Sequence, residues 1–498
     1  MKSKPMLRPL RLMLGERIDP ALPTPIYLQV IAAIIRDIER GRLAPGTYLP
    51  SSRQLSAELG LNRKTVVLAY EELIAQGWLE SAGTRGTTVA TSFPDPVSRN
   101  RTATPHLRRA ADKPQPQYRI LPTPERPLAL PGGDGIKLDE GAPDGRLFPT
   151  ETLAQAYRAA LRRSASENYL QYRDPLGTPA LRTAIADMLR HQRGLTIGPE
   201  EVCITRGSQN GLFLAAQALL RPGDAAIVEE LTYEPAIAAF RVLGARIIPV
   251  RFRDRAIDVE AVEQACRRHK VRAIFLTPHH QFPTTRELRP DRRLALLTLA
   301  KQFGFAIIED DYDHEFHFAS QPLLPMAAYA PDQVIYLGSL SKLLVPALRV
   351  GYVVAPEPMI RALGHYVSLT DGMGNSVTED AVAQLITSGA LRRHARKVHK
   401  IYAQRRARFA EKLRETFGTR IAFDTPDGGL AFWLRFPGTD LVALEDQARA
   451  LGLRFASSAS FVANPEAERG LRIGFASLNN AEADNAIQAL AKALDRVG

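Results

Sequence analysis

A proline-rich stretch divides this chain and most limits what it can fold into. Nine prolines fall between Phe93 and Gly133 in a sequence of 498 residues. Proline lacks a backbone donor and fixes φ, so neither a continuous helix nor a central strand fits there. We therefore expect a semi-rigid linker over residues 92–134, between a small unit at 24–91 and a large unit at 135–498.

The composition indicates a globular protein with more than one domain. Hydrophobic residues make up 45% of the chain and charged residues 24%, which are ordinary globular values. The two cysteines, Cys203 and Cys266, cannot build a disulfide framework or a four-cysteine zinc site. Neither a signal peptide nor a run of about 20 apolar residues that could span a membrane is recognisable. We expect a cytoplasmic protein.

Positive charge is concentrated near the start of the sequence. Residues 1–130 carry 19 Lys and Arg and 11 Asp and Glu, which leaves +8 of the formal net charge of +12. This asymmetry indicates either that the N-terminal part faces a polyanion or that its basic residues are merely solvated.

The small unit has the order of elements found in a winged helix-turn-helix. Apolar residues at helical spacing predict an amphipathic helix over residues 26–38. Ser51 and Gln54 form a capping-box pattern before a short second helix, and Asn62 can cap a third helix over Arg63–Ala75. A tight turn between two helices is typical of a helix-turn-helix.

Two short strands and a flexible turn follow the third helix and predict a wing. The strands are expected at residues 78–80 and 87–89, on either side of a glycine-rich turn. The start of the third helix is where base edges are read, while other basic residues meet phosphates or a groove. The candidate DNA contacts are Arg53, Arg63, Lys64, Thr65 and Arg85. The alternative is a three-helix module whose basic residues are only solvated.

This unit resembles the winged helix of GntR-type bacterial regulators over residues 24–91. The resemblance rests on the strings Leu49-Pro50-Ser51-Ser52-Arg53, Asn62-Arg63-Lys64-Thr65-Val66 and Gly86-Thr87. It implies double-stranded operator DNA as the partner, and it implies that Arg53, Arg63 and the wing glycine Gly86 lie against that DNA.

The large unit alternates strand-like and helical runs. Apolar runs such as residues 273–276 and 306–308 are separated by helical stretches such as residues 292–303. This alternation predicts an α/β domain with a largely parallel or mixed sheet covered on both faces.

Three separated motifs of the large unit indicate pyridoxal 5'-phosphate as a cofactor. Lys342 follows two serines in a loop of small residues, Asp310 follows a strand expected at residues 305–309, and residues 207–209 precede an expected helix. The cofactor needs a lysine for an imine, a carboxylate for its pyridinium nitrogen and donors such as a helix N-terminus for its phosphate. Taken alone, Lys342 could be an ordinary surface lysine.

The large unit resembles fold-type-I aminotransferases, of class I and II, over about residues 135–497. The resemblance implies an internal aldimine on Lys342, Asp310 at the pyridine nitrogen and Tyr312 at the phenolic oxygen. It also implies further contacts to the cofactor and to a substrate or effector: Ser208, Gln209, Ser339 and Arg349 at the phosphate, Tyr172 at the phosphate of a partner subunit, Tyr233 stacked on the ring, and Arg472 at a carboxylate. The whole chain is then multidomain, a small winged helix-turn-helix (α+β) plus a large α/β fold-type-I aminotransferase-like domain.

Two of these assignments have plainer alternatives, and one further pair of residues raises the question of a metal. Tyr233 could be ordinary packing, and Arg472 could be a structural ion-pair residue. His279 and His280 are adjacent but have no third spaced ligand in the sequence, so no metal is expected.

One position departs from the aminotransferase pattern. Phe282 stands where those enzymes have an asparagine on the phenolic oxygen, and a phenyl ring cannot donate that hydrogen bond. The departure argues against efficient transamination. A His-Gln-aromatic-Pro string is instead typical of MocR-type regulators, which are GntR winged helices joined by a linker to an aminotransferase-like domain. The chain resembles them over nearly its full length.

This resemblance implies a transcriptional regulator that binds operator DNA and holds pyridoxal phosphate on Lys342. Its effector is either the cofactor itself or an amine or amino acid that displaces Lys342, and Arg472 would bind the carboxylate of an amino acid. The resemblance also implies a head-to-tail homodimer in which each winged helix lies over the partner's large domain. Two alternatives stay open: an aminotransferase with an accessory DNA-binding domain, and a DNA-binding module whose empty cofactor domain serves only dimerisation.

Overall fold

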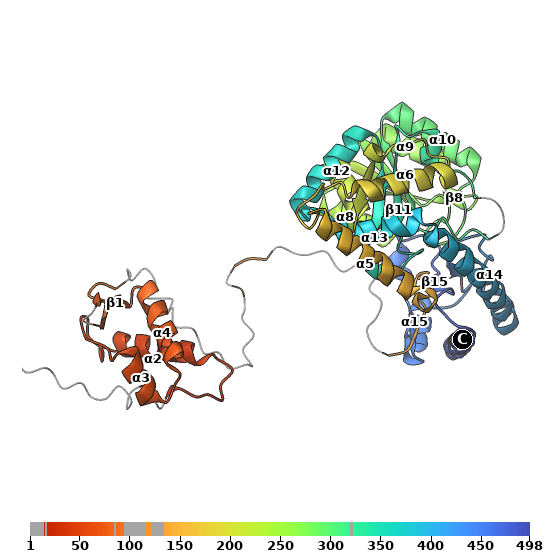
Figure 1. The fold of residues 1–498 in the computed structure, drawn as a ribbon. Coiled ribbons are helices and arrows are strands. Elements are labelled where there is room, and N and C mark those ends of the chain that lie inside the picture. Colours follow the sequence, from red (N-terminus) through yellow and green to blue (C-terminus); the bar gives the residue numbers. More distant parts are fainter. Residues whose placement is uncertain are drawn as a thin grey trace, which may run out of the picture. The chain divides into compact units, whose positions relative to one another are not determined.

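The chain forms two compact units, Met1–Leu121 and Pro122–Gly498, and each is described here by itself (Figure 1). The computed structural model describes residues 14, 17–83, 86–93, 116, 118–120, 134–318 and 322–498. Most of the predicted linker lies outside these residues. No helix in the described ranges is long and apolar enough to cross a membrane.

The N-terminal unit is a winged helix-turn-helix, as the sequence predicts. Its elements are α2 (Ile26–Glu39), α3 (Ser52–Leu59), α4 (Arg63–Ala75), β1 (Leu79–Ser81) and β2 (Thr87–Val89). The strands pair antiparallel as the wing, and the apolar face of α2 packs on α4 around a small core that includes Ile34, Val66 and Leu73.

Side-chain caps set the starts of the two short helices. Ser51 Oγ accepts from the backbone N–H of Gln54 at 3.2 Å, and Asn62 Oδ1 accepts from that of Lys64 at 2.9 Å. The predicted capping box is only half formed, because the Gln54 amide donates to Glu58 instead of returning to Ser51. A further small difference is that β1 begins at Leu79, one residue later than expected.

The large unit is built on a seven-stranded mixed sheet. The strand order is β4-β12-β11-β10-β9-β5-β6, and only β12 runs antiparallel to its neighbours. The strands are β4 (Val202–Thr205), β5 (Ala225–Glu229), β6 (Arg246–Val250), β9 (Val271–Leu276), β10 (Ala306–Asp311), β11 (Val334–Ser339) and β12 (Gly351–Val354). The α/β prediction is therefore confirmed.

Helices cover both faces of this sheet (Figure 1). Ile307 belongs to the core on one face and Ile308 to the core on the other, because successive strand residues point to opposite sides. One face is covered by α7 (Ser208–Leu219), α8 (Glu234–Val242) and α12 (Glu357–Thr370). The other face is covered by α6 (Pro179–Arg193), α9 (Val259–Arg268) and α10 (Pro290–Phe303).

The remaining elements complete the large unit beside the sheet. Three small pairings occur between β13 (Ala431–Leu434) and β15 (Leu471–Gly474), β14 (Leu453–Arg454) and β3 (Ile136–Lys137), and β7 (Phe252–Arg253) and β8 (Ala256–Ile257). The other helices are α5 (Thr150–Ser166), α11 (Met326–Tyr329), α13 (Ser376–Thr387), α14 (Ala390–Phe417), α15 (Leu441–Ala450) and α16 (Asn480–Val497).

Two element boundaries differ from the sequence prediction in a way that matters for the site. Asp310 lies inside β10 and does not follow it, so its side-chain direction is fixed by the pleat. Helix α7 begins at Ser208, so Ser208 and Gln209 belong to its first turn and do not precede it. Both shifts place predicted site residues on regular structure.

We expect the cap at Asn62 to stabilise α4 measurably. Asn62→Ala removes the acceptor for the Lys64 N–H and should cost about 1 kcal/mol of unfolding free energy, whereas Asn62→Asp keeps an acceptor and should cost little. The chain has two tryptophans, so in a Trp433→Phe background urea unfolding of the N-terminal unit can be followed by Trp78 fluorescence. Equal unfolding midpoints for the Ala and Asp variants would contradict the role of the cap.

Candidate functional site

A cavity of about 460 Å³ lies where several strands of the sheet end. Ser339 ends β11, Asp310 lies one residue before the end of β10, and Thr277 directly follows β9. In open α/β sheets, ligands bind at the carboxyl ends of the strands. The lining brings together most of the predicted cofactor residues: Ser208, Gln209, Tyr233, Asp310, Tyr312, Ser339, Lys342 and Arg349.

Asp310 presents an unpaired carboxyl group to this cavity. The residue is buried, and its Oδ1 has no hydrogen-bond partner among the described residues. Burial, together with the nearby charges of Asp311 and Asp313, raises the pKa of Asp310 to about 8. A buried polar atom without a partner is costly, so this carboxyl group is suited to a ligand that brings a donor.

Lys342 reaches the same cavity from the loop after β11. Its Nζ donates a hydrogen bond to the carbonyl oxygen of Gly141. Desolvation lowers the pKa of Lys342, although Asp139 and Asp313 act in the opposite direction. A lysine with a lowered pKa supplies more of the neutral, nucleophilic amine.

The start of α7 and Arg349 form the cationic end of the cavity. Gly207 precedes α7 with φ of +84°, and the free N–H groups of a helix start favour an anion. Arg349 has φ of 51°, an uncommon value for a residue with a side chain, and its Nη2 donates to the Arg206 carbonyl at 2.7 Å. Gly351 permits the close approach, since a Cβ there would lie 2.6 Å from Gly207. This end could hold a phosphate.

Arg472 lies behind the cavity wall. Its guanidinium carbon is 4.4 Å from the centre of the Phe282 ring, and its nitrogens donate to Glu140 O, Pro283 O and the Tyr312 hydroxyl. The side chain is 1% exposed and does not line the cavity. The structure therefore places Arg472 next to the other predicted residues but covers it with Phe282.

The remaining aromatic candidates differ in position. Tyr233 lines the cavity with its ring 5.1 Å from that of Phe282 in an edge-to-face contact. Tyr312 donates to the His280 carbonyl at 2.9 Å, so its hydroxyl is already engaged. Tyr172 is 93% exposed and does not line the cavity of its own chain.

Sequence reasoning missed Glu140, which also lines the cavity. Its Oε1 is buried without a partner in the described structure, and burial raises its pKa although Lys342 and Arg472 lower it. It lies far from the recognised motifs in the sequence, in the segment after β3. The only sequence signal was the Gly141-Ala142-Pro143 turn that follows it.

In the N-terminal unit, the predicted DNA contacts lie at the start of α4 and beside it. Arg53, Arg63 and Lys64 are exposed, Thr65 is half-buried, and Gly86 has φ of +114°. The two arginines and the lysine have no ion-pair partner in the part of the chain that the structure describes. Such cations are available to phosphates and bases. Arg85, which was also predicted, lies outside the described residues.

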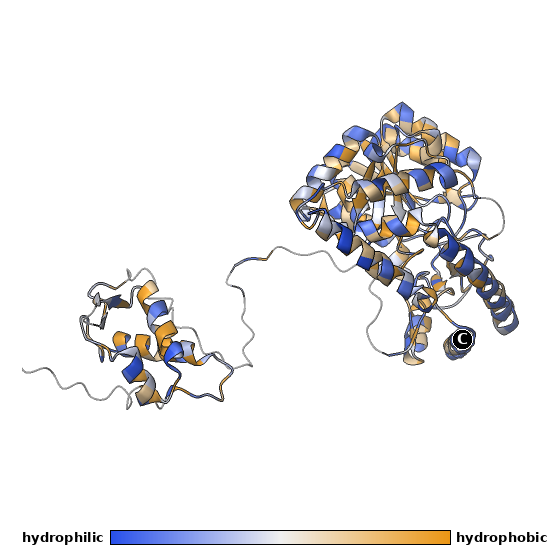
Figure 2. Ribbon diagram, in the orientation of Figure 1, coloured by the Kyte–Doolittle hydropathy of each residue, from blue (hydrophilic) through white to orange (hydrophobic). Residues whose placement is uncertain are grey.

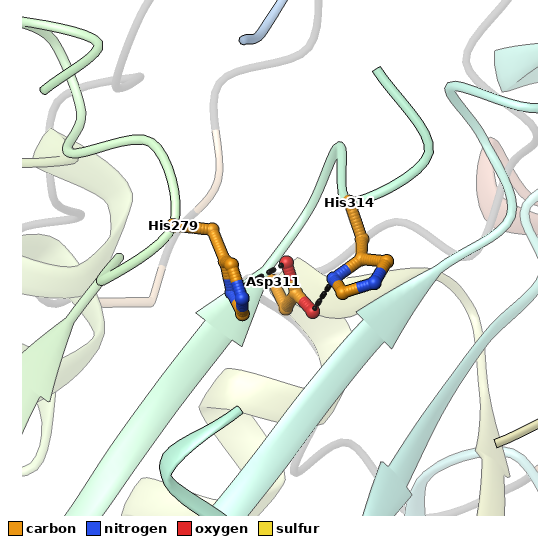
Figure 3. Close-up of side chains that lie close together, drawn as sticks. All are labelled: His279, Asp311 and His314. Atoms are coloured by element: carbon orange, nitrogen blue, oxygen red, sulfur yellow. Dashed lines mark ion pairs between the residues drawn. The ribbon is translucent and has the colours of Figure 1, made fainter. Parts of the chain in front are cut away.

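His279, the first of the two adjacent histidines, lies with His314 beside the buried carboxylate of Asp311, the last residue of β10 (Figure 3). The Asp311 carboxylate lies between two imidazoles, 3.3 Å from His279 Nδ1 and 2.9 Å from His314 Nδ1. The sequence did not show that Asp311 and His314 lie beside His279, and these three side chains could hold a cation. The expectation of no metal stays a prediction. The same carboxylate also accepts from Tyr336 at 2.5 Å and lies 3.7 Å from Arg193. These cationic and donor groups already compensate its charge.

The two imidazoles titrate in opposite directions. Burial lowers the pKa of His279, but Asp311 raises it by more, so the net shift is upward from 6.5. Burial lowers the pKa of His314, and Asp311 does not fully offset the effect. Protonated His279 is therefore a better partner for the Asp311 carboxylate than protonated His314 is.

Comparisons with known proteins agree with both units. The aminotransferase class I and II family model matches residues 133–490, and the model of the bacterial regulatory proteins of the gntR family matches residues 26–89. The chain is 31% identical to the probable rhizopine catabolism regulatory protein MocR of Rhizobium meliloti, over 93% of this chain and 92% of that protein. It is 32% identical to the pyridoxine biosynthesis transcriptional regulator PdxR of Corynebacterium glutamicum, over 92% of this chain and 94% of that protein.

Solved structures resemble the large unit. The alpha-aminoadipate aminotransferase LysN of Thermus thermophilus, complexed with N-(5'-phosphopyridoxyl)-L-leucine, matches with a TM-score of 0.67 and 29% identity. The match covers 73% of this chain and 92% of that chain. The kynurenine aminotransferase of Pyrococcus horikoshii, in complex with PMP, also has a TM-score of 0.67, with 27% identity over 73% of this chain and 91% of that chain.

We expect His279→Asn and His314→Asn to change the pH dependence of stability in opposite ways. His279 contributes its whole share of the free energy of unfolding below pH 6.5. This contribution is lost as pH rises through the raised pKa of His279 in the folded protein. His314 has a lower pKa in the folded protein than in the unfolded chain, so the unfolded chain binds a proton there first. As pH falls from 6.5 to the lowered folded pKa, His314 therefore lowers the free energy of unfolding.

Urea unfolding of the large unit, followed by Trp433 fluorescence in a Trp78→Phe background between about pH 5 and 8, measures both effects. The deficit of His279→Asn relative to wild type should shrink above pH 6.5. For His314→Asn, the stability relative to wild type should rise as pH falls below 6.5. Three parallel stability curves would contradict the assigned pKa shifts.

Proposed function

Because the chain belongs to the MocR-type family, in which a GntR winged helix is joined to an aminotransferase-like domain, we propose that it is a regulator controlled by pyridoxal 5'-phosphate chemistry. The DNA-binding domain comprises residues 24–91, the linker 92–134 and the cofactor domain 135–498. Lys342 holds the cofactor, and a small molecule bound there changes the affinity for operator DNA.

The unpaired Asp310 carboxyl group is the observation that carries the proposal. Asp310 lines the cavity that Lys342 also lines, and its buried Oδ1 has no hydrogen-bond partner among the described residues. An ionised carboxylate pairs with a protonated ring nitrogen, and that pairing would lower the raised pKa of Asp310. In the loaded protein, this pairing would compensate the free-energy cost of removing the Asp310 carboxylate from water.

The other cavity residues fit the same group. The N–H groups at the start of α7, with Ser208, Gln209, Ser339 and Arg349, would hold the phosphate. Tyr233 would stack on the ring, and the Tyr312 hydroxyl would turn from the His280 carbonyl to the phenolic oxygen. When bound, pyridoxal phosphate supplies an aldehyde carbon that condenses with a primary amine and can be exchanged between Lys342 and an incoming amine.

Lys342 also gives the proposed switch its two states. While Lys342 holds the cofactor, its amine is engaged in that attachment. A Lys342 side chain that is not bound to the cofactor would donate to the Gly141 carbonyl, as it does in this structure. An effector with a carboxylate would bind Arg472 bidentately, which requires the Phe282 ring to move aside. The effector is the cofactor itself or such an amine.

The DNA contacts are assigned to the basic residues of the winged helix. Arg63, Lys64 and Thr65 at the start of α4 read base edges, while Arg53 and the wing residues Arg85 and Gly86 contact the backbone or a groove. Removing a base-reading arginine relaxes sequence preference, whereas removing a phosphate contact weakens binding to all sequences.

The regulator is a head-to-tail homodimer in this proposal. Tyr172 is 93% exposed, and Leu170 and Leu369 are also exposed, at 55% and 82%. Large exposed apolar side chains are typical of association surfaces. Tyr172 would complete the phosphate site of the partner subunit, so each site would need both chains.

Phe282 distinguishes this proposal from an aminotransferase with an accessory DNA-binding domain. Its ring contacts Tyr233, Tyr312 and Phe461 edge-to-face and lies over Arg472. An apolar ring there cannot stabilise a charged oxygen. We therefore expect at most partial reactions with an amino donor, without repeated cycles in the presence of a keto acid.

The first expected outcome is that borohydride fixes the cofactor on Lys342. Lys342→Ala removes the covalent attachment but leaves Asp310 and the phosphate contacts, so it should bind pyridoxal phosphate weakly and reversibly. Peptide mapping after reduction identifies the labelled residue, and Lys301→Ala is the control. Label on any lysine other than Lys342 would refute the assignment.

The second expected outcome is that an amino-acid effector needs Arg472. Arg472→Lys keeps the charge but loses the planar guanidinium fork. This loss costs about 1.5–3 kcal/mol for a charged hydrogen bond and raises the effector concentration needed about 10- to 150-fold. Wild-type operator affinity should change about 5- to 150-fold between free and effector-loaded forms.

Operator duplexes selected in vitro from a random library provide the probe for titrations of apo, cofactor-loaded and amino-acid-loaded protein. An unshifted response in Arg472→Lys would show that the cofactor itself is the signal. Identical curves for all forms of the wild-type protein would refute ligand-controlled DNA binding.

A further inference from the structure

The first half of α14 carries five exposed cations that no described residue of the large unit neutralises. They are Arg392, Arg393, Arg396, Lys397 and Lys400. None of them has an ion-pair partner within the described parts of the chain, and residues 390–410 contain no Asp or Glu. By contrast, Arg405, Arg408 and Lys412 further along the helix pair with Asp144, Asp484 and Glu415. We name the five residues the α14 cationic stripe.

The stripe is unfavourable for the helix that bears it. Helix starts carry partial positive charge, so cations there are destabilising. The N-cap of α14 is Gly389, which makes no side-chain cap, and the first turn contains no acidic residue. Arg392 and Arg396, Arg393 and Lys397, and Arg396 and Lys400 are like charges four residues apart, which repel one another. Local stability therefore does not explain the stripe.

Other exposed cations of the large unit do have a local explanation. Arg241, Arg268 and Lys301 lie in the last turns of α8, α9 and α10, where a cation complements the helix dipole. The arrangement in α14 is instead shared with α4 of the winged helix, whose first two residues are the exposed cations Arg63 and Lys64. That helix is the one that the proposed function places against DNA.

We propose that the α14 cationic stripe is a second DNA-binding surface, which contacts the phosphate backbone of the duplex outside the site read by the winged helix. The five residues follow one another over nine positions of the helix, about 12 Å along its axis. A duplex carries about seven phosphates over that length. Because side chains at these positions meet only phosphates, the contact is independent of base sequence.

Nucleic acid fits this surface better than a membrane does. A membrane-surface helix inserts an apolar face beside its basic one. The apolar face of α14 is already buried, because Leu391, Val398 and Tyr402 belong to the core of the large unit. Figure 2 shows the hydrophilic colour along most of α14. A polyanion that accepts charge without apolar contact is therefore the expected occupant.

The test compares two matched triple variants of the full chain. Arg392→Gln with Arg396→Gln and Lys400→Gln removes one row of the stripe. The control, Arg241→Gln with Arg268→Gln and Lys301→Gln, removes the same residue types and the same net charge elsewhere. Binding to a long random-sequence duplex is titrated over a series of salt concentrations. The stripe variant should bind more weakly, with a salt slope reduced by up to about 2.7, or about 0.9 for each lost contact. The control should keep the wild-type slope.

Thermal unfolding without DNA separates binding from folding. The stripe variant relieves repulsion and should melt at the wild-type temperature or above it. A lower melting temperature would assign the stripe a structural role. Equal salt slopes for the two variants would overturn the proposal, and so would a stripe-dependent binding to anionic phospholipid vesicles with DNA binding unchanged. The inference needs DNA binding by this family but not the cofactor, so apo protein serves, and its failure leaves the Lys342 proposal intact.

Discussion

Three consecutive acidic residues at the end of β10 are the constraint on which the large unit depends. Glu309, Asp310 and Asp311 are all buried, and a strand sends alternate side chains to opposite faces. Glu309 accepts from the backbone of α11, and Asp311 is compensated by His279, His314, Tyr336 and Arg193. Only Asp310 faces the cavity, and its Oδ1 has no partner within the described structure. The same strand thus holds two acids that other groups of the fold engage and one, Asp310, that lines the cavity without a charged or hydrogen-bonding partner among the described residues.

Phe282 also lines the cavity, and in our proposal it is the residue that weakens catalysis while the cofactor site is kept. Phe282 brings an aromatic ring where a donor would stabilise developing charge, and it packs against Tyr233, Tyr312 and Arg472. Such packing holds the ring and the guanidinium in a fixed relation. A ligand that reaches Arg472 must displace the ring, and this couples ligand binding to a change in shape. Coupling of that kind is what a regulator needs, because a ligand can shift a conformational equilibrium only by its differential affinity for the two states.

Both units of the chain have a helix that begins with exposed cations. In the first turns of α4 and α14, exposed basic residues lie where the helix dipole disfavours them, and the later cations of the α14 cationic stripe repel one another. Elsewhere in the large unit, cations such as Lys301 complete helix ends or, like Arg405, pair with carboxylates. A local cost that the fold does not require is a sign of an external partner, and a polyanion is the partner that this charge pattern favours.

The sequence by itself determined the elements and the chemical identity of the site, because these depend on short-range patterns. The helix at Arg63–Ala75 agrees with its predicted bounds, since Asn62 supplies a local cap. Lys342, Asp310 and Arg349 were recognisable from their motifs. Only the tertiary structure decided what these residues meet. Glu140, far away in the sequence, joins the cavity, Phe282 covers Arg472, and Asp311 and His314 join His279. Those contacts arise from the packing of strands and loops separated by tens to hundreds of residues, and such packing leaves no local pattern in the sequence.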